Sequence, residues 1–222
     1  MSASRGRAPS LRGLLSAALI AGLVAGLIAA ALQQLFLVPL ILRAELLEVA
    51  GHAQPMQAIS IERTIYSVLF TCLGACGFAL LLGACYTLRG DVSWRGGLLW
   101  GLAGFVSFAL APALGLPPEL PGAHPGDLAL RQMWWITTAG ATAVGLACIA
   151  FSRATALKLL GVALIALPHL FGAPQATQGD SDLPTDMAWT FALSSLAVSA
   201  LMWLILGALT PVLMRRYKAQ TG

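Results

Sequence analysis

Charged residues are scarce in this 222-residue chain. They make up 10% of it, and hydrophobic residues make up 58%. Soluble domains contain about 25% charged residues. A soluble fold of this size could not remove so much apolar surface from water. The composition therefore excludes an ordinary soluble domain and predicts an integral membrane protein.

The chain also lacks the short motifs of common enzymes. It contains no G-x-x-x-x-G-K-[ST] phosphate loop, no G-x-S-x-G nucleophile turn and no H-E-x-x-H zinc motif. Its apolar runs contain almost no ionisable side chain, which argues against a proton relay of buried carboxylates. Since no nucleophile–base pair is evident either, we expect that the protein is not an enzyme and has no permanently bound cofactor.

Cysteine is present but forms no C-x-x-C pair, which argues against a zinc ribbon or a thioredoxin-like site. Cys72 and Cys76 are four residues apart and share a helix face. They could hold a soft metal. Packing as small apolar side chains is the interpretation that we favour.

Long apolar runs take the place of motifs. A transmembrane helix needs about 20 apolar residues. A sixth run, 157–171, is shorter and contains Pro168, so by length alone it could be re-entrant or interfacial. The five runs that reach the required length or come close to it are 14–38, 64–88, 97–116, 132–151 and 188–214.

The distribution of charge favours six crossings with both termini in the cytoplasm, because basic residues collect in cytoplasmic loops. On this topology, ten basic residues and one acid, Asp91, lie inside, while three basic residues and eight acids lie outside. If 157–171 did not cross, the basic tail at 215–218 would lie outside. The net charge of +4 thus reflects orientation and not a nucleic acid partner. We predict an all-α, polytopic membrane helix bundle with six transmembrane helices, N-in and C-in, as a single membrane domain over residues 1–222.

Glycine pairs predict close helix packing. Gly22 and Gly26 form a G-x-x-x-G pair in the first run, and Gly97 and Gly101 form another in the third. Small residues at this spacing let helix backbones approach, although glycines scattered by chance are the alternative for either pair. Trp203 is deep in the last run, where we expect it to pack between helices.

A weak internal repeat links two hairpins. Arg63 opens the second run and Arg131 the fourth, and Gly77 and Gly145 each follow 14 residues later. This suggests two hairpins of the same orientation, as in some transporters, with chance similarity as the alternative. Both arginines begin helices from the outer side, where extension to the headgroups is the simplest account and pairing with acids of the outer loops is the alternative.

All three histidines and eight of the acids lie on the outer side of the predicted topology. Imidazole with carboxylate is a suitable ligand set for a borderline divalent cation, and an acidic face raises the local cation concentration. The candidate metal ligands are Glu45, Glu48 and His52, then His169, and then Glu119 and His124.

The first candidate group has the spacing i, i+3 and i+7, which places Glu45, Glu48 and His52 on one helix face if Gly51 does not end the helix. A solvated amphipathic loop helix is the alternative. Glu119 and His124 lie in a proline-rich loop that could hold them in place or serve only as a rigid connector.

His169 follows Pro168 near the outer end of the short run. Proline removes a helical hydrogen bond and frees a carbonyl group, which at membrane depth is tolerated only within protein or in a wet cavity. An imidazole beside this break is a candidate entry ligand for a cation. The alternative is an interfacial histidine bonded to a neighbouring helix.

Four strings of sequence carry a family resemblance: LVPLILRAE at 37–45, ALAPALGLPPELPG at 109–122, RQMWW at 131–135 and LPHLFGAP at 167–174. They extend from the first run through the fifth and are similar to the CbtA family, a bacterial family of predicted cobalt transporter components. On the family pattern, His169 and Glu45 are the site positions that carry over to this chain.

The resemblance implies a membrane subunit of a cobalt uptake system in the bacterial inner membrane, with Co²⁺ as the transported ion. It also implies a small one-span histidine-rich partner subunit (CbtB-like), which would supply ligands that a chain with three histidines lacks. Cobalt and nickel are equally compatible with these residues. The alternative function is a non-transporting scaffold or assembly factor for that partner, an interpretation that the scarcity of polar groups in the runs supports.

Overall fold

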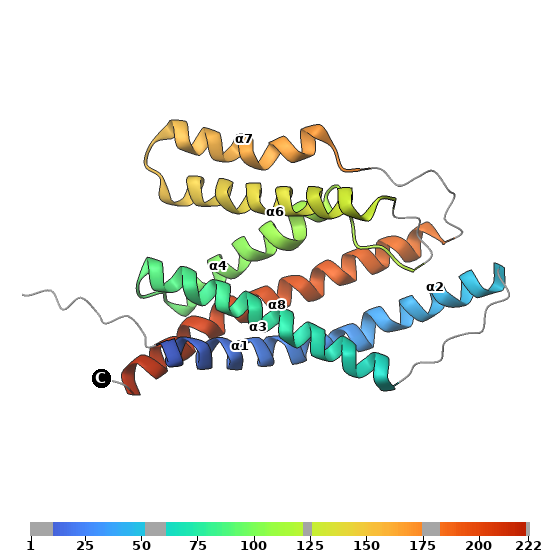
Figure 1. Ribbon diagram of the computed structural model, residues 1–222, viewed down its shortest axis with the longest axis horizontal. Coiled ribbons are helices and arrows are strands. Elements are labelled where there is room, and N and C mark those ends of the chain that lie inside the picture. The colour runs from blue at the N-terminus through green and yellow to red at the C-terminus, as the bar shows by residue number, and fades with distance from the viewer. Residues whose placement is uncertain (1–10, 52–60, 122–125, 175–182, 221–222) are drawn as a thin grey trace, which may run out of the picture. The chain divides into compact units, whose positions relative to one another are not determined.

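The computed structural model describes residues 11–51, 61–121, 126–174 and 183–220, and all regular structure in these ranges is helical (Figure 1). The helices are α1 (Leu11–Leu32), η1 (Gln33–Leu37), α2 (Val38–Gly51), α3 (Ile61–Arg89), α4 (Trp94–Phe105), η2 (Val106–Leu110), α5 (Ala111–Ala113), α6 (Leu128–Phe151), α7 (Thr155–Phe171) and α8 (Thr185–Gln220).

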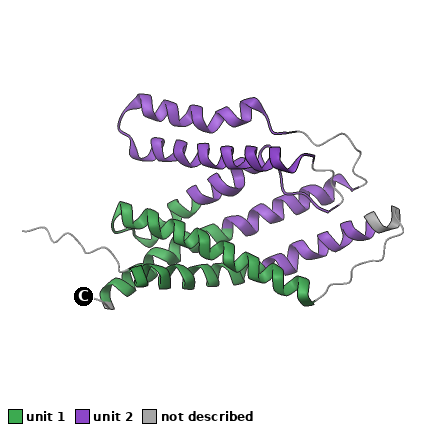
Figure 2. Cartoon of the chain, viewed as in Figure 1, with its two compact units in different colours: residues 1–31, 59–102, 201–222 green, residues 32–58, 103–200 purple. Residues whose placement is uncertain are grey.

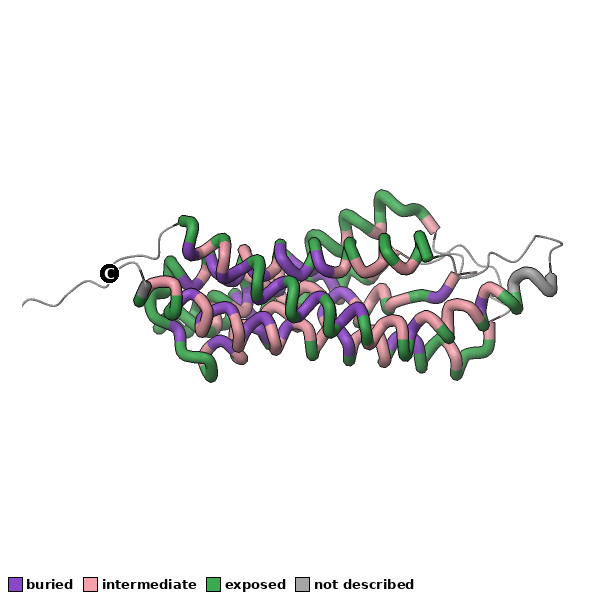
Figure 3. Tube along the Cα trace, turned by 90° about the horizontal axis from the view of Figure 1, so that it is seen from below, coloured by how far each residue is buried: buried purple, intermediate pink, exposed green. Residues whose placement is uncertain are grey.

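Within the described residues, 5 helical stretches are long and apolar enough to cross a membrane, while α7 is a shorter apolar helix of 17 residues. Large apolar side chains remain exposed on these helices, among them Leu99 (70%) and Phe70 (68%). Exposed apolar surface of this extent is what a lipid-facing helix needs. Buried and exposed residues alternate along the helices (Figure 3). The chain is therefore a multi-pass membrane protein.

Most of the helices extend beyond the apolar runs from which they are predicted, whereas the third stretch, Trp94–Ala113, ends before the predicted residue 116. The largest difference is in the first, which was predicted to end at residue 38 but continues as one apolar stretch over Leu11–Leu47. Pro39 does not break it, because the wider π-helical turn η1 ends two residues before this proline. The turn η2 precedes Pro112 in the same way. A π turn changes the local hydrogen-bond pattern, at the place where proline cannot donate a bond.

The described chain divides into two compact units (Figure 2). Unit 1 comprises residues 1–31, 59–102 and 201–222, so it contains α1, α3, most of α4 and the second part of α8. Unit 2 comprises residues 32–58 and 103–200, which include α6, α7 and both π turns.

In unit 1, α1 packs closely on α3 through the first glycine pair. A β-carbon on Gly22 would overlap the Cα atom of Cys76, and one on Gly26 would lie 2.7 Å from the Cα atom of Cys72. The Cys76 thiol also donates to the Leu19 carbonyl at 3.7 Å. The two cysteines therefore pack as small side chains against the glycines, which is the favoured interpretation from the sequence.

The second glycine pair holds α4 against α8, also within unit 1. A β-carbon on Gly97 would overlap the carbonyl oxygen of Gly207, and one on Gly101 would overlap that of Trp203. The Tyr86 hydroxyl donates to the Gly207 carbonyl at 3.1 Å. Trp203 is 1% exposed and packs against an aromatic ring of α3, as predicted.

In unit 2, α6 and α7 form an antiparallel hairpin whose helices lie side by side (Figure 1). A β-carbon on Gly145 would be 2.5 Å from the carbonyl oxygen of Gly161, and one on Gly161 would be 2.6 Å from that of Gly145. The two backbones therefore touch at this pair. Gly77, which the internal repeat aligns with Gly145, has no atom of another described segment within 4 Å of its β-carbon position. The two aligned glycines thus have different packing roles.

We expect Gly101→Ala to lower the free energy of unfolding by about 1–3 kcal/mol, because its β-carbon would meet backbone atoms that cannot rotate away. Gly77→Ala is the matched control: its β-carbon would enter open space, and alanine favours a helix over glycine by up to about 1 kcal/mol. Thermal unfolding of both variants in one detergent measures the difference. Equal stability of the two variants would contradict the close contact.

Candidate functional site

His169 lies in the last turn of α7, where the helix ends at Gly172 with φ 81°. Its imidazole ring packs on the Trp134 ring in a T-shaped arrangement, with centroids 5.9 Å apart and planes inclined by 73°. The Nε2 atom is buried and has no hydrogen-bond partner within the described chain. A neutral imidazole offers one donor and one acceptor nitrogen, so the hydrogen-bonding capacity of this atom is unused within the described chain.

Trp134 of α6 is held between His169 and the segment that follows α5. A β-carbon on Gly115 would overlap the indole ring, so only glycine leaves room for it there. The indole Nε1 is also buried with no acceptor among the described residues. An indole N–H can only donate, so it cannot bind a cation directly but can donate to a water molecule beside the imidazole.

Two threonines continue this polar face along α6. Thr138 and Thr142 follow Trp134 at four-residue intervals and are 0% exposed. The hydroxyl of each has no hydrogen-bond partner within the part of the chain that the structure describes. Neither residue was among the candidates predicted from the sequence. The signal was the regular spacing of Trp134, Thr138 and Thr142 inside an otherwise apolar run.

Glu119 is bound by Arg131 and therefore differs from the other candidate ligands. The guanidinium donates from Nη2 to Oε2 at 2.7 Å and from Nη1 to Oε1 at 3.3 Å. For Arg131, the structure thus shows pairing with a loop carboxylate, which was the alternative to extension toward the headgroups. A cation that used Glu119 would have to compete with a bidentate arginine.

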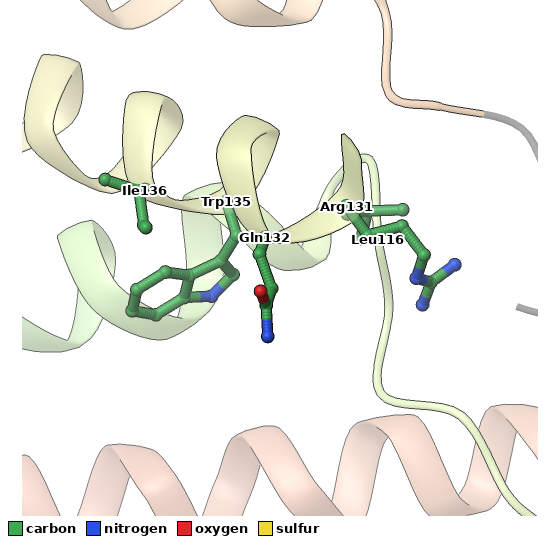
Figure 4. Close-up of a pocket in the computed structure, with 5 residues that line it drawn as sticks. All are labelled: Leu116, Arg131, Gln132, Trp135 and Ile136. Atoms are coloured by element: carbon green, nitrogen blue, oxygen red, sulfur yellow. The ribbon is translucent and has the colours of Figure 1, made fainter. Parts of the chain in front are cut away.

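The same arginine lines an open pocket of about 590 Å³ at the start of α6, together with Leu116, Gln132, Trp135 and Ile136 (Figure 4). Gln132 and Trp135 project from the same side of the helix in this view. These lining residues include no His, Cys, Asp or Glu side chain that could coordinate a cation. The pocket is therefore a poor cation site.

The remaining candidates are not gathered into one cluster by the described structure. Glu45 is half-buried in α2, and the helix continues through Glu48 to Gly51, as its spacing requires. His52 and His124, like the side chain of Glu48, lie outside the described residues. Where the chain is described, no three His, Cys, Asp or Glu side chains lie close enough to share one metal ion.

Comparison with known proteins settles the family. A family model described as "Probable cobalt transporter subunit (CbtA)" matches residues 11–215. The chain belongs to this family. Membership in the CbtA family confirms the resemblance drawn from the four strings and implies Co²⁺ as the transported ion. No curated protein and no solved structure matches the chain.

The Arg131–Glu119 pair should contribute measurably to stability. We expect a double-mutant cycle with Arg131→Gln and Glu119→Gln to give a coupling energy of about 0.5–1 kcal/mol. This value is at the upper end of the range for partly exposed ion pairs, because the contact is bidentate. The control cycle uses Lys218→Gln and Asp91→Asn. That pair makes a single 3.3 Å contact, and the Asp91 side chain is 71% exposed.

Chemical unfolding at low salt measures both coupling energies. The Lys218–Asp91 value should be close to zero. Equal coupling in the two cycles would contradict a special role for the bidentate pair.

Proposed function

We propose that this chain is the membrane subunit of a cobalt uptake system and passes Co²⁺ from the outer face of the bacterial inner membrane to the cytoplasm. The observation that carries the proposal is the His169 imidazole, whose Nε2 atom is buried and has no hydrogen-bond partner among the described residues. Neutral imidazole is a good ligand for divalent cobalt. Membership in the CbtA family supplies the identity of the ion.

The proposed topology has six spans, N-in and C-in, with α7 as the fifth. At 1.5 Å per residue, the 17 residues of α7 extend over roughly 25 Å, against a hydrocarbon core of about 30 Å. The close Gly145–Gly161 contact holds α7 along α6, so the shorter helix is packed on a longer partner. The excess of basic residues on one side of this topology supports the same orientation.

In this topology, His169 and Trp134 lie at the outer end of the α6–α7 hairpin, opposite the loop that joins the two helices. Acids of the outer loops concentrate the cation at the surface, and His169 is its first imidazole ligand. Glu45 is the second ligand that we propose, with Glu48, His52, His124 and Glu119 as further candidates for the outer approach.

The proposed partner is a small one-span subunit with a histidine-rich end. This chain contains only three histidines, so further imidazole ligands would have to come from another subunit. A partner rich in imidazole would supply these ligands. In this scheme the chain carries out no covalent chemistry.

Uptake of radioactive cobalt by cells that express the chain and its small partner tests the function. We expect His169→Phe to lower uptake at least tenfold, because the ring packing on Trp134 is kept while the ligand nitrogen is lost. Glu45→Gln should also lower uptake. Leu170→Ala is the control, since this neighbouring side chain is 80% exposed. Normal uptake by His169→Phe, at normal protein levels, would remove His169 from the mechanism.

Cobalt flux into vesicles that contain the purified wild-type chain distinguishes transport from the alternative function as a scaffold or assembly factor. A permease gives cobalt flux, alone or with the small partner. A scaffold or assembly factor gives none in either case, and that outcome would contradict the proposal.

Single cysteines in a cysteine-free background test whether α7 crosses the membrane. Arg153 precedes α7 and Thr185 begins α8, and both side chains are exposed. We expect an impermeant thiol reagent to label Thr185→Cys in intact cells, and Arg153→Cys only after the membrane is opened. Labelling of both from the same side would show that α7 does not cross.

A further inference from the structure

Buried polar atoms without partners are concentrated in one hairpin. Within the described chain, six side-chain nitrogen or oxygen atoms are buried with no hydrogen-bond partner, and four of them belong to α6 and α7. Those four are Trp134 Nε1, Thr138 Oγ1, Thr142 Oγ1 and His169 Nε2. Buried polar groups normally have partners, so this concentration requires an explanation.

These atoms follow one direction along α6. Residues four apart on a helix are separated by about 6 Å along its axis and share a face. Thr138 is therefore about 6 Å and Thr142 about 12 Å further along the helix than Trp134, the residue that meets His169. At Gly145 the two backbones touch, and Ile165 of α7 also approaches its β-carbon position at 2.7 Å. The polar face thus ends at a tight apolar contact.

A hydroxyl buried without a partner is unfavourable by about 1–3 kcal/mol, relative to one that is hydrogen-bonded. Apolar residues fill most of the run that contains Thr138 and Thr142, and valine has nearly the same shape as threonine. The hydroxyls are therefore not needed for packing. They are suited to bind something that is polar and enters from the His169 end.

We propose that Thr138 and Thr142 extend the His169 site inward as an intermediate binding position along which a partly hydrated divalent cation meets His169, Thr138 and Thr142 in succession. The inference rests on the proposed function. It adds two ligands, which lie further along α6 than the Trp134–His169 contact. His169 offers one nitrogen, each threonine offers oxygen lone pairs, and the Trp134 N–H donates to a water molecule that the ion retains. The position ends at Gly145 and Gly161, so inward release requires these helices to part at that contact.

The chemistry of the ligands selects a cation over other occupants. Hydroxyl oxygen and imidazole nitrogen can both coordinate a borderline divalent ion. No carboxylate or ammonium group belongs to this set, so an ion held here keeps part of its hydration shell and remains exchangeable. An anion would find only the indole N–H and the threonine hydroxyls, beside an imidazole lone pair that repels it.

Isosteric variants test the proposal. Thr138→Val and Thr142→Val remove only the hydroxyls. Thr210→Val is the matched control: Thr210 is also 0% exposed with an unpartnered hydroxyl, but it belongs to unit 1. Each purified full-length variant is melted in detergent with and without cobalt chloride, and cobalt uptake is measured in cells.

We expect all three valine variants to fold, with melting temperatures without cobalt no lower than that of the wild type. Thr138→Val and Thr142→Val should lose most of the cobalt-induced rise in melting temperature and raise the KM for uptake about tenfold, the effect of a group worth roughly 1.4 kcal/mol. Thr210→Val should keep the wild-type KM for uptake and the wild-type cobalt-induced rise in melting temperature.

Two results separate failure of the inference from failure of the proposed function. If the wild type takes up cobalt and both hairpin variants match it in KM and in the cobalt-induced shift, the inference is wrong and the function stands. If the wild type takes up no cobalt, the proposed function is wrong. In that case the cobalt-induced rise in melting temperature tests the binding position without transport. The inference is wrong if this rise is the same in the wild type and the hairpin variants, or if none of them shows it.

Discussion

Helices in this protein are joined where glycine lets two backbones touch. Apolar burial cannot drive this association within a bilayer, because lipid chains are as apolar as leucine side chains. Close packing and polar contacts must do so instead. In unit 1, Gly97 meets Gly207, whose carbonyl also accepts the Tyr86 hydroxyl. In unit 2, Gly145 meets Gly161. Each unit therefore depends on positions where even one methyl group does not fit.

The Gly145–Gly161 contact also sets the register of the candidate site. Because it fixes how far α7 extends along α6, it places the last turn of α7 beside Trp134. A shift of one helical turn would move His169 by about 5 Å and separate its ring from the indole. The proline before His169 and the left-handed Gly172 after it end the helix at this place. Packing in one half of the hairpin thus positions the chemistry in the other half.

Sequence alone was enough for the helical membrane class, the family and the close glycine pairs. It was not enough for the continuation of the first helix past Pro39, because hydropathy does not reveal a π turn that accommodates proline. Thr138 and Thr142 were missed for a different reason. Threonine is common in apolar helices, where its hydroxyl usually bonds to the preceding turn, and only the structure shows that these two do not. Likewise, Arg131 had two possible partners until Glu119 was placed beside it.

A site of neutral ligands suits the transport that we propose. A carboxylate buried in a medium of low dielectric constant attracts a divalent ion strongly, and an ion held so tightly leaves slowly, whereas conduction requires binding weak enough to permit release. On the proposed topology, eight of the nine acids lie on the outer side, where water and salt weaken their attraction. They can concentrate the ion without trapping it. His169, Thr138 and Thr142 would then replace part of its hydration shell along the hairpin with lone pairs that carry no net charge. The scarcity of charge in the helices, which at first supported a scaffold, is thus equally what a path for a divalent ion requires.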